Sequence, residues 1–148
     1  PKARAMIADA SFQNDPEVRD QRLKAFRKTI KRAKVPSELS EAFDAMRSEF
    51  PADQPLRCRS STNSEDLEGF NGAGLYDSFT HRPDEGRIEV TIKKVWASLW
   101  NLRAFDERDF YRIDHFEASM AVLVHPNFDN ESANGVALTK NIYFPKFR

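Results

Sequence analysis

The chain has 148 residues, about the size of one domain, of which 40% are hydrophobic and 31% charged. Its 23 basic and 23 acidic side chains cancel, so no global charge draws it to nucleic acid or to an anionic membrane. No apolar run approaches the roughly 20 residues of a membrane-spanning helix, which excludes a membrane span. The single cysteine, Cys58, cannot form an intramolecular disulfide, and we expect a buried thiol in a cytoplasmic protein.

Neither end of the chain has the character of a natural terminus. The chain opens on Pro1 without an initiator Met, and no secretory signal follows. It stops within the apolar and basic stretch 144–148. We therefore expect one incomplete domain over 1–148, with a helical part at 1–54 and a core at 55–148.

Two amphipathic helices are predicted in the first third of the chain. Asp15 can cap a helix that has Pro16 in its first turn. Its apolar positions recur at helical spacing: Leu23, Phe26, Ile30 and Ala33. Val35–Ser37 is predicted to close this helix and to cap a second one that runs to Pro51. The basic side chains from Arg19 to Lys34 either bind a polyanion or face solvent, and solvent is the simpler interpretation.

A strand, a short helical turn, a glycine-rich loop and a second strand are predicted next. Alternation over Leu56–Ser60 gives one apolar face and one face with two arginines. Thr62–Glu65 fits a capping box at the start of a helical turn. The loop that follows contains three glycines: Gly69, Gly72 and Gly74. Leu75–Thr80 then alternates as a strand does.

The rest of the chain mixes helices and strands. Helical spacing predicts helices over 88–102 and 105–113. A buried strand at Ala118–Val124, a polar loop at Asn127–Asn134 and a strand at Gly135–Thr139 form a predicted hairpin. Because helices alternate with hairpin strands, the fold class is predicted to be α+β.

The segment from Arg57 to Phe79 combines the groups that a phosphate site requires. An arginine side chain offers a fixed fork of donors to phosphate oxygens. Glycines allow the backbone N–H groups to approach an anion closely. The glycine spacing matches neither the P-loop nor the dinucleotide-binding motif. Composition alone therefore leaves both phosphate binding and an ordinary hairpin turn open.

Four segments, in order, resemble the nucleotide-binding domain of phosphoenolpyruvate synthase and pyruvate phosphate dikinase. They are Arg59–Ser61 with Glu65–Leu67 and Phe70–Phe79, then Val95–Trp100 with Arg103–Ala104, then Met120–Val124, and then Gly135–Thr139. The resemblance extends over about residues 55 to 140, and residues 1–35 show none. Four matches in order are more specific than any one of them.

The resemblance implies an ATP-grasp fold, in which ATP lies between two α+β lobes. It implies transfer of the β-phosphate of ATP to a histidine on a separate domain and then to pyruvate or another acceptor, with Mg²⁺ neutralising the polyphosphate. The metal ligands and the phospho-accepting histidine are expected outside this chain. None of His81, His115 and His125 is therefore that histidine, and the chain alone is expected to be inactive.

The same resemblance assigns ATP-binding roles to five positions. Arg59 falls on the arginine that contacts phosphate, and Ser78 on a hydroxyl that can reach it. Gly74 falls on the loop glycine whose backbone covers the phosphates, while Gly72 and Ala73 shape the same loop.

Two departures from the family pattern affect the predicted site. His125 stands where the family often has a glutamine beside the adenine, so it is a candidate adenine contact. Leu75–Tyr76 replaces a pair that is usually more polar. These departures leave room for an alternative, a nucleotide-binding or regulatory module without catalysis.

Overall fold

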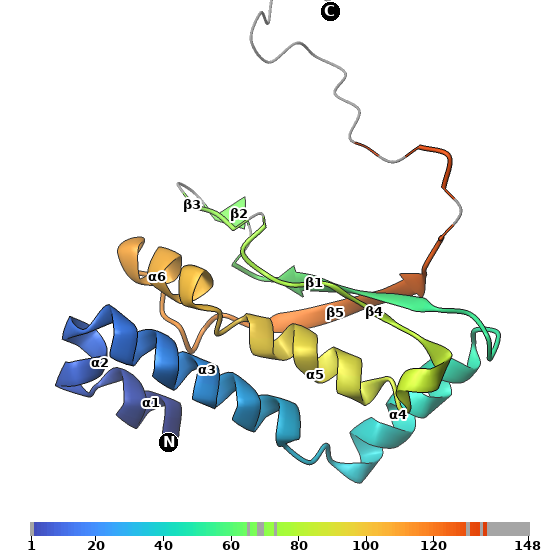
Figure 1. Ribbon diagram of the computed structural model, residues 1–148, viewed down its shortest axis with the longest axis horizontal. Coiled ribbons are helices and arrows are strands. Elements are labelled where there is room, and N and C mark those ends of the chain that lie inside the picture. Colours follow the sequence, from blue (N-terminus) through green and yellow to red (C-terminus); the bar gives the residue numbers. More distant parts are fainter. Residues whose placement is uncertain are drawn as a thin grey trace, which may run out of the picture.

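A computed structural model describes residues 2–64, 66–67, 70–72, 74–129, 131–133 and 135. Figure 1 shows a small antiparallel sheet with helices stacked below one of its faces. This mixture confirms the predicted α+β class. Within the described ranges, no helix is long and apolar enough to cross a membrane.

The first helices of the chain are α1 (Lys2–Ile7), α2 (Ala10–Asn14) and α3 (Pro16–Arg32). The predicted cap of α3 is confirmed, because Asp15 Oδ1 accepts hydrogen bonds from the N–H groups of Glu17 and Val18. The short helices α1 and α2 were not predicted.

The next helix, α4 (Ser37–Ser48), begins without a side-chain cap. Pro36, within the predicted segment Val35–Ser37, occupies the capping position, and Ser37 is already helical. The proline side chain has no hydrogen-bond acceptor, so it cannot bind the free N–H groups of the first turn.

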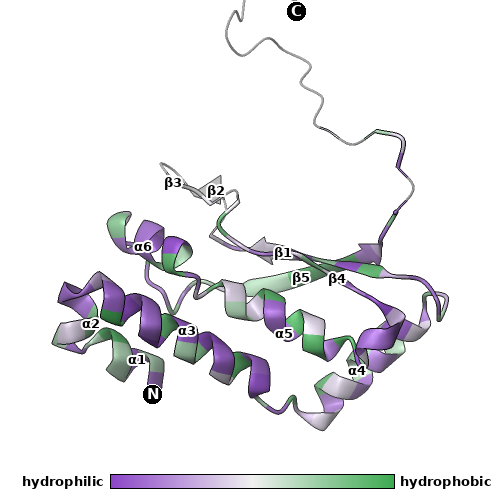
Figure 2. Ribbon diagram, viewed as in Figure 1, coloured by the Kyte–Doolittle hydropathy of each residue, from purple (hydrophilic) through white to green (hydrophobic). Residues whose placement is uncertain are grey.

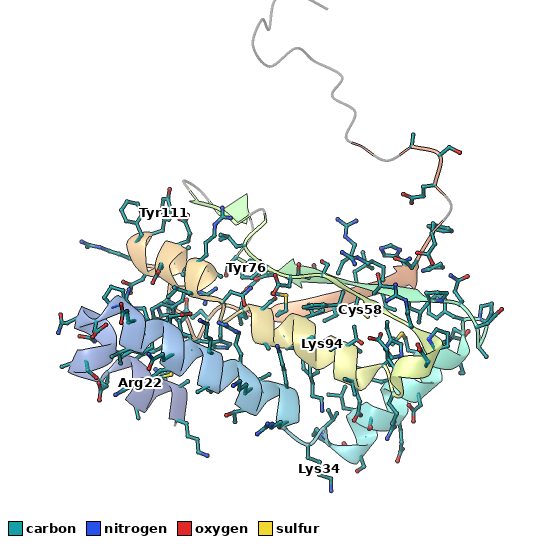
Figure 3. All side chains as sticks on the ribbon, in the orientation of Figure 1. Arg22, Lys34, Cys58, Tyr76, Lys94 and Tyr111 are labelled. Carbon is teal, nitrogen blue, oxygen red and sulfur yellow. The ribbon has the colours of Figure 1, made fainter. Side chains whose placement is uncertain are left out.

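The main sheet has three strands in the order β4–β1–β5, and both pairings are antiparallel. The central strand is β1 (Leu56–Thr62), flanked by β4 (Phe79–His81) and β5 (Met120–Pro126). Leu56 and Cys58 of β1 are fully buried, as the alternation predicted. Figure 3 shows Cys58 between the sheet and the helix below it.

Helix α5 (Glu89–Ser98) lies against all three strands (Figures 1 and 2) and contributes Ile92 and Val95 to the core that covers them. Their common core comprises Leu56, Cys58, Ile88, Ile92 and Val95. The two helices predicted over 88–102 and 105–113 correspond to α5 and α6 (Leu102–Phe110), but the break between them falls earlier than predicted, because Asn101 before α6 has an extended ψ of 143°.

Helix α3 packs on α5 from the side away from the sheet and forms a second core. This core joins buried residues of α2, α3, α6 and the chain around them: Phe12, Leu23, Leu99, Trp100, Phe105 and Ala118. Phe12 and Phe105 meet edge to face, with ring centroids 5.3 Å apart.

The helical turn predicted at Thr62–Glu65 was wrong. Thr62 Oγ1 accepts from the N–H of Ser64, two residues on, and the chain continues into β2 (Asp66–Leu67) and β3 (Phe70–Asn71), an antiparallel pair. The hydroxyl therefore stabilises a local turn in place of a helix.

The two remaining predicted strands have different outcomes. The strand predicted at Leu75–Thr80 begins only at Phe79, because the residues before it turn toward α6. The strand predicted at Gly135–Thr139 lies outside the described residues except for Gly135.

Candidate functional site

One face of the three-stranded sheet, called the open face below, is not covered by the described helices, which lie on the opposite side (Figure 1). The register places these side chains on the open face: Arg57, Arg59, Thr80, Leu123 and His125. Leu123 is 59% exposed there, whereas inward-facing Cys58 is fully buried. The face combines cationic, hydroxyl and apolar groups over a rigid base.

Arg59 and Ser78 are brought together at one end of this face. Cys58 pairs with Phe79, so the next residue of β1 lies beside the residue preceding β4. The N–H of Ser60 donates to Ser78 Oγ over 3.3 Å. The Arg59 side chain is exposed and makes no hydrogen bond or ion pair with any other described residue. Its guanidinium donors are therefore available to an anion.

Arg57 lies on the same face but is already engaged. Its Nη1 donates to Thr80 Oγ1 over 3.2 Å, and that hydroxyl donates to Asn127 Oδ1 over 3.1 Å. Strand alternation placed both arginines on one face, but it could not separate the engaged side chain from the available one.

Gly72 and Gly74 belong to a tight turn before β4. The N–H of Leu75 donates to the carbonyl of Gly72 over 3.2 Å, and Gly74 has a φ of +76°. A Cβ added at Gly74 would meet no atom within 4 Å, so its backbone conformation, not crowding, requires glycine. Ala73, the remaining predicted loop residue, lies outside the described residues.

Three contacts anchor the end of this turn. Leu75 is buried against Ala104 of α6. The Tyr76 hydroxyl accepts from Nη1 of Arg108 over 3.3 Å, and Figure 3 shows Tyr76 between α6 and the sheet. Asp77 Oδ2 accepts from Nδ2 of Asn101 over 3.0 Å. The pair that departs from the family pattern therefore supports the loop from inside.

Sequence reasoning missed Arg108, although its side chain is fully buried on α6. Arginine in an amphipathic helix normally faces solvent, so no pattern singled it out. Burial lowers the pKa of Arg108, while its hydrogen bond to the Tyr76 hydroxyl acts in the opposite direction.

His125 lies on β5, and its Nδ1 is 2.8 Å from the carbonyl oxygen of Pro126. Because a carbonyl can only accept, Nδ1 carries the proton, and in the neutral ring Nε2 remains an acceptor. The other two histidines do not lie on the open face. His81 is bonded to Thr91 and His115 to Arg108, and burial lowers the pKa of both rings.

Among the residues that the structure describes, no group of three or more His, Cys, Asp or Glu side chains could hold a metal ion. The site in this part of the chain therefore consists of arginine, hydroxyl, histidine and backbone groups.

An open sheet face beside a glycine turn defines a candidate phosphate-binding site in an α+β domain. A family model described as the pyruvate phosphate dikinase AMP/ATP-binding domain matches residues 2–145 of the chain. The chain belongs to this family, which is an ATP-binding domain of phosphotransferases related to phosphoenolpyruvate synthase. The match also includes residues 2–35, for which the sequence alone indicated no resemblance.

Three curated relatives illustrate the similarity. Phosphoenolpyruvate synthase from Aeropyrum pernix is 38% identical over 81 residues, which is 55% of this chain and 10% of that protein. The enzyme of the same name from Pyrococcus furiosus is 27% identical over 133 residues, 86% of this chain and 16% of that protein. Rifampicin phosphotransferase from Bacillus cereus is 30% identical over 116 residues, 78% of this chain and 13% of that protein. The chain thus spans a small part of each relative.

Proposed function

We propose that the open face of the sheet and the glycine turn bind ATP with its phosphates at Arg59. In this proposal, Arg59 and Ser78 hold phosphate oxygens, and the backbone at Gly74 covers them. Gly72 and Ala73 give the turn its shape. His125 lies toward the adenine, where its Nε2 acceptor suits the amino group of the base.

The observation that carries the proposal is the state of Arg59. An exposed arginine with no side-chain partner among the described residues, set beside Ser78 in the segment that follows the glycine turn, offers two parallel N–H donors to an anion. Ser78 complements it, because its oxygen accepts the Ser60 N–H and its own hydrogen remains available to a phosphate. Arg57 is a weaker candidate because Thr80 already binds it.

The proposed reaction is that of a dikinase-type phosphotransferase with an ATP-grasp fold. The β-phosphate of ATP passes to a histidine on another domain of the same polypeptide and then to pyruvate or another acceptor. Arg59 would orient the phosphates and neutralise charge as it develops on them. Mg²⁺ is assigned to the nucleotide phosphates and to no residue described here. We place the protein in the cytoplasm, for which the buried free thiol of Cys58 is suited.

The chain alone is proposed to bind ATP without turning it over, because the acceptor histidine and the acceptor site are assigned to other domains. Release of AMP from ATP by the purified 148-residue chain would refute this part of the proposal. The supporting result is unchanged ATP after prolonged incubation with excess Mg²⁺.

Calorimetric titration with ATP and excess Mg²⁺ tests the binding site. We expect Arg59→Ala to weaken binding by about tenfold or more, because a charge-assisted hydrogen bond contributes roughly 1.5–3 kcal/mol. Arg32→Ala is the matched control, since Arg32 is an exposed arginine in the last turn of α3. Equal binding by the wild type and Arg59→Ala would contradict the proposed site, and absence of binding by the wild type would refute ATP binding by this chain.

A further inference from the structure

Arg108 is a fully buried arginine whose donors reach three different segments. Its Nη2 donates to the carbonyl of Leu99 over 2.6 Å, its Nε to Nδ1 of His115 over 3.3 Å, and its Nη1 to the Tyr76 hydroxyl over 3.3 Å. It forms no ion pair with a carboxylate among the described residues. All its hydrogen-bond partners on these segments are therefore neutral acceptors.

A buried guanidinium without a carboxylate is costly, so its surroundings must compensate the charge. Leu99 is the C-terminal cap of α5, where the helix dipole concentrates partial negative charge. The His115 ring stacks on Phe105 with centroids 3.9 Å apart, which fixes the ring that accepts from Arg108. Two of the three acceptors are thus rigid.

The third acceptor belongs to the glycine turn. Tyr76 lies two residues after Gly74 and two residues before Ser78. A Cβ added at Gly74 would meet no atom within 4 Å, so no side chain closes over this residue from that side. The residues that follow it connect the turn to α6 and its neighbours. Leu75 packs without a preferred direction and the Asp77 bond is exposed, whereas the bond between Arg108 and Tyr76 is directional and partly buried.

We propose that Arg108 is a positioning residue for the ATP phosphates, acting through the Tyr76 hydroxyl that holds the glycine turn beside Arg59. This inference rests on the proposed function. Arg108 contacts no nucleotide in this arrangement; it connects the turn to the end of α5 and to the His115 ring. Tyr76 belongs to the pair Leu75–Tyr76 that departs from the family pattern, and in this proposal it holds the glycine turn in place.

Tyr76→Phe tests the inference, because it removes the acceptor and keeps the partly buried ring. Amide hydrogen exchange of the ligand-free chain is expected to become about fivefold faster at residues 72–78, as for the loss of one hydrogen bond. Ser40→Ala is the matched control, because it also removes one hydroxyl that forms a hydrogen bond. The Ser40 hydroxyl donates to Glu89 Oε2 over 2.6 Å, away from the turn. Unchanged exchange at 72–78 in Tyr76→Phe would overturn the proposal.

Nucleotide titrations separate positioning from general destabilisation. Tyr76→Phe is expected to weaken binding of ATP with Mg²⁺ about fivefold and to leave binding of adenosine, which has no phosphate, unchanged. Equal weakening of both ligands would indicate a structural role only and would overturn the inference. If the wild type and Tyr76→Phe bind ATP with equal affinity, the positioning role is refuted and the proposed function stands. If the wild type binds no ATP, the proposed function fails, and this inference fails with it.

Discussion

Gly74→Ala is expected to destabilise the protein through backbone strain alone. Gly74 has a φ of +76°, and the left-handed region costs a residue with a Cβ roughly 1–2 kcal/mol. No steric term adds to this cost, since the new Cβ would meet no atom within 4 Å. The free energy of unfolding should therefore fall by about 1–2 kcal/mol, partly offset by the lower entropy of the unfolded chain. Urea unfolding followed by circular dichroism measures it.

Gly135→Ala is the matched control for this prediction. Gly135 also has open space around it, but its φ lies outside the left-handed region. Alanine there should leave stability unchanged or raise it slightly by restricting the unfolded chain. If the two variants had the same free energy of unfolding, the strain argument at Gly74 would be refuted.

Two further predictions concern buried titratable groups. Burial raises the pKa of Cys58 to about 11, so the thiol of the native protein should not react with a disulfide reagent at pH 8. The thiol should react fully once urea has unfolded the chain. Fast reaction of the native protein would contradict the burial of Cys58. Burial lowers the pKa of His81 and His115 below the ordinary 6.5, so the unfolded chain binds more protons as the pH falls below 6.5. The free energy of unfolding should therefore decrease from pH 7 to 5, by at most about 1.4 kcal/mol per pH unit for each histidine. His115→Gln should reduce this pH dependence. Urea midpoints that do not change with pH would contradict the prediction.

Local patterns predicted much of the fold. The cap at Asp15, the apolar face of α3 and the alternation along β1 depend on neighbouring residues, and all are confirmed. The short helices α1 and α2 were missed although Asp9 caps α2, because a lone cap does not predict a helix of five residues; α2 is also held by packing of Phe12 against distant Phe105. The division between α5 and α6 was predicted, but too far along the chain, because apolar spacing continues past the extended Asn101.

The candidate site was predicted from the sequence only in part. Alternation and resemblance selected Arg59, and the register then placed it beside Ser78. The support beneath the loop could not be predicted, because Arg108 is 32 residues away from Tyr76 along the chain. Such a bond depends on how α6 packs, and a buried arginine has no distinctive sequence pattern.

A map of backbone amide chemical shifts on addition of ATP and Mg²⁺ tests the central claim most directly. If ATP binds the open face, the largest changes should occur at Arg59, Gly74, Ser78 and His125, and the amides of α3 should stay unchanged. Changes confined to α3, with its basic side chains between Arg19 and Arg32, would instead indicate polyanion binding and contradict the proposed ATP site.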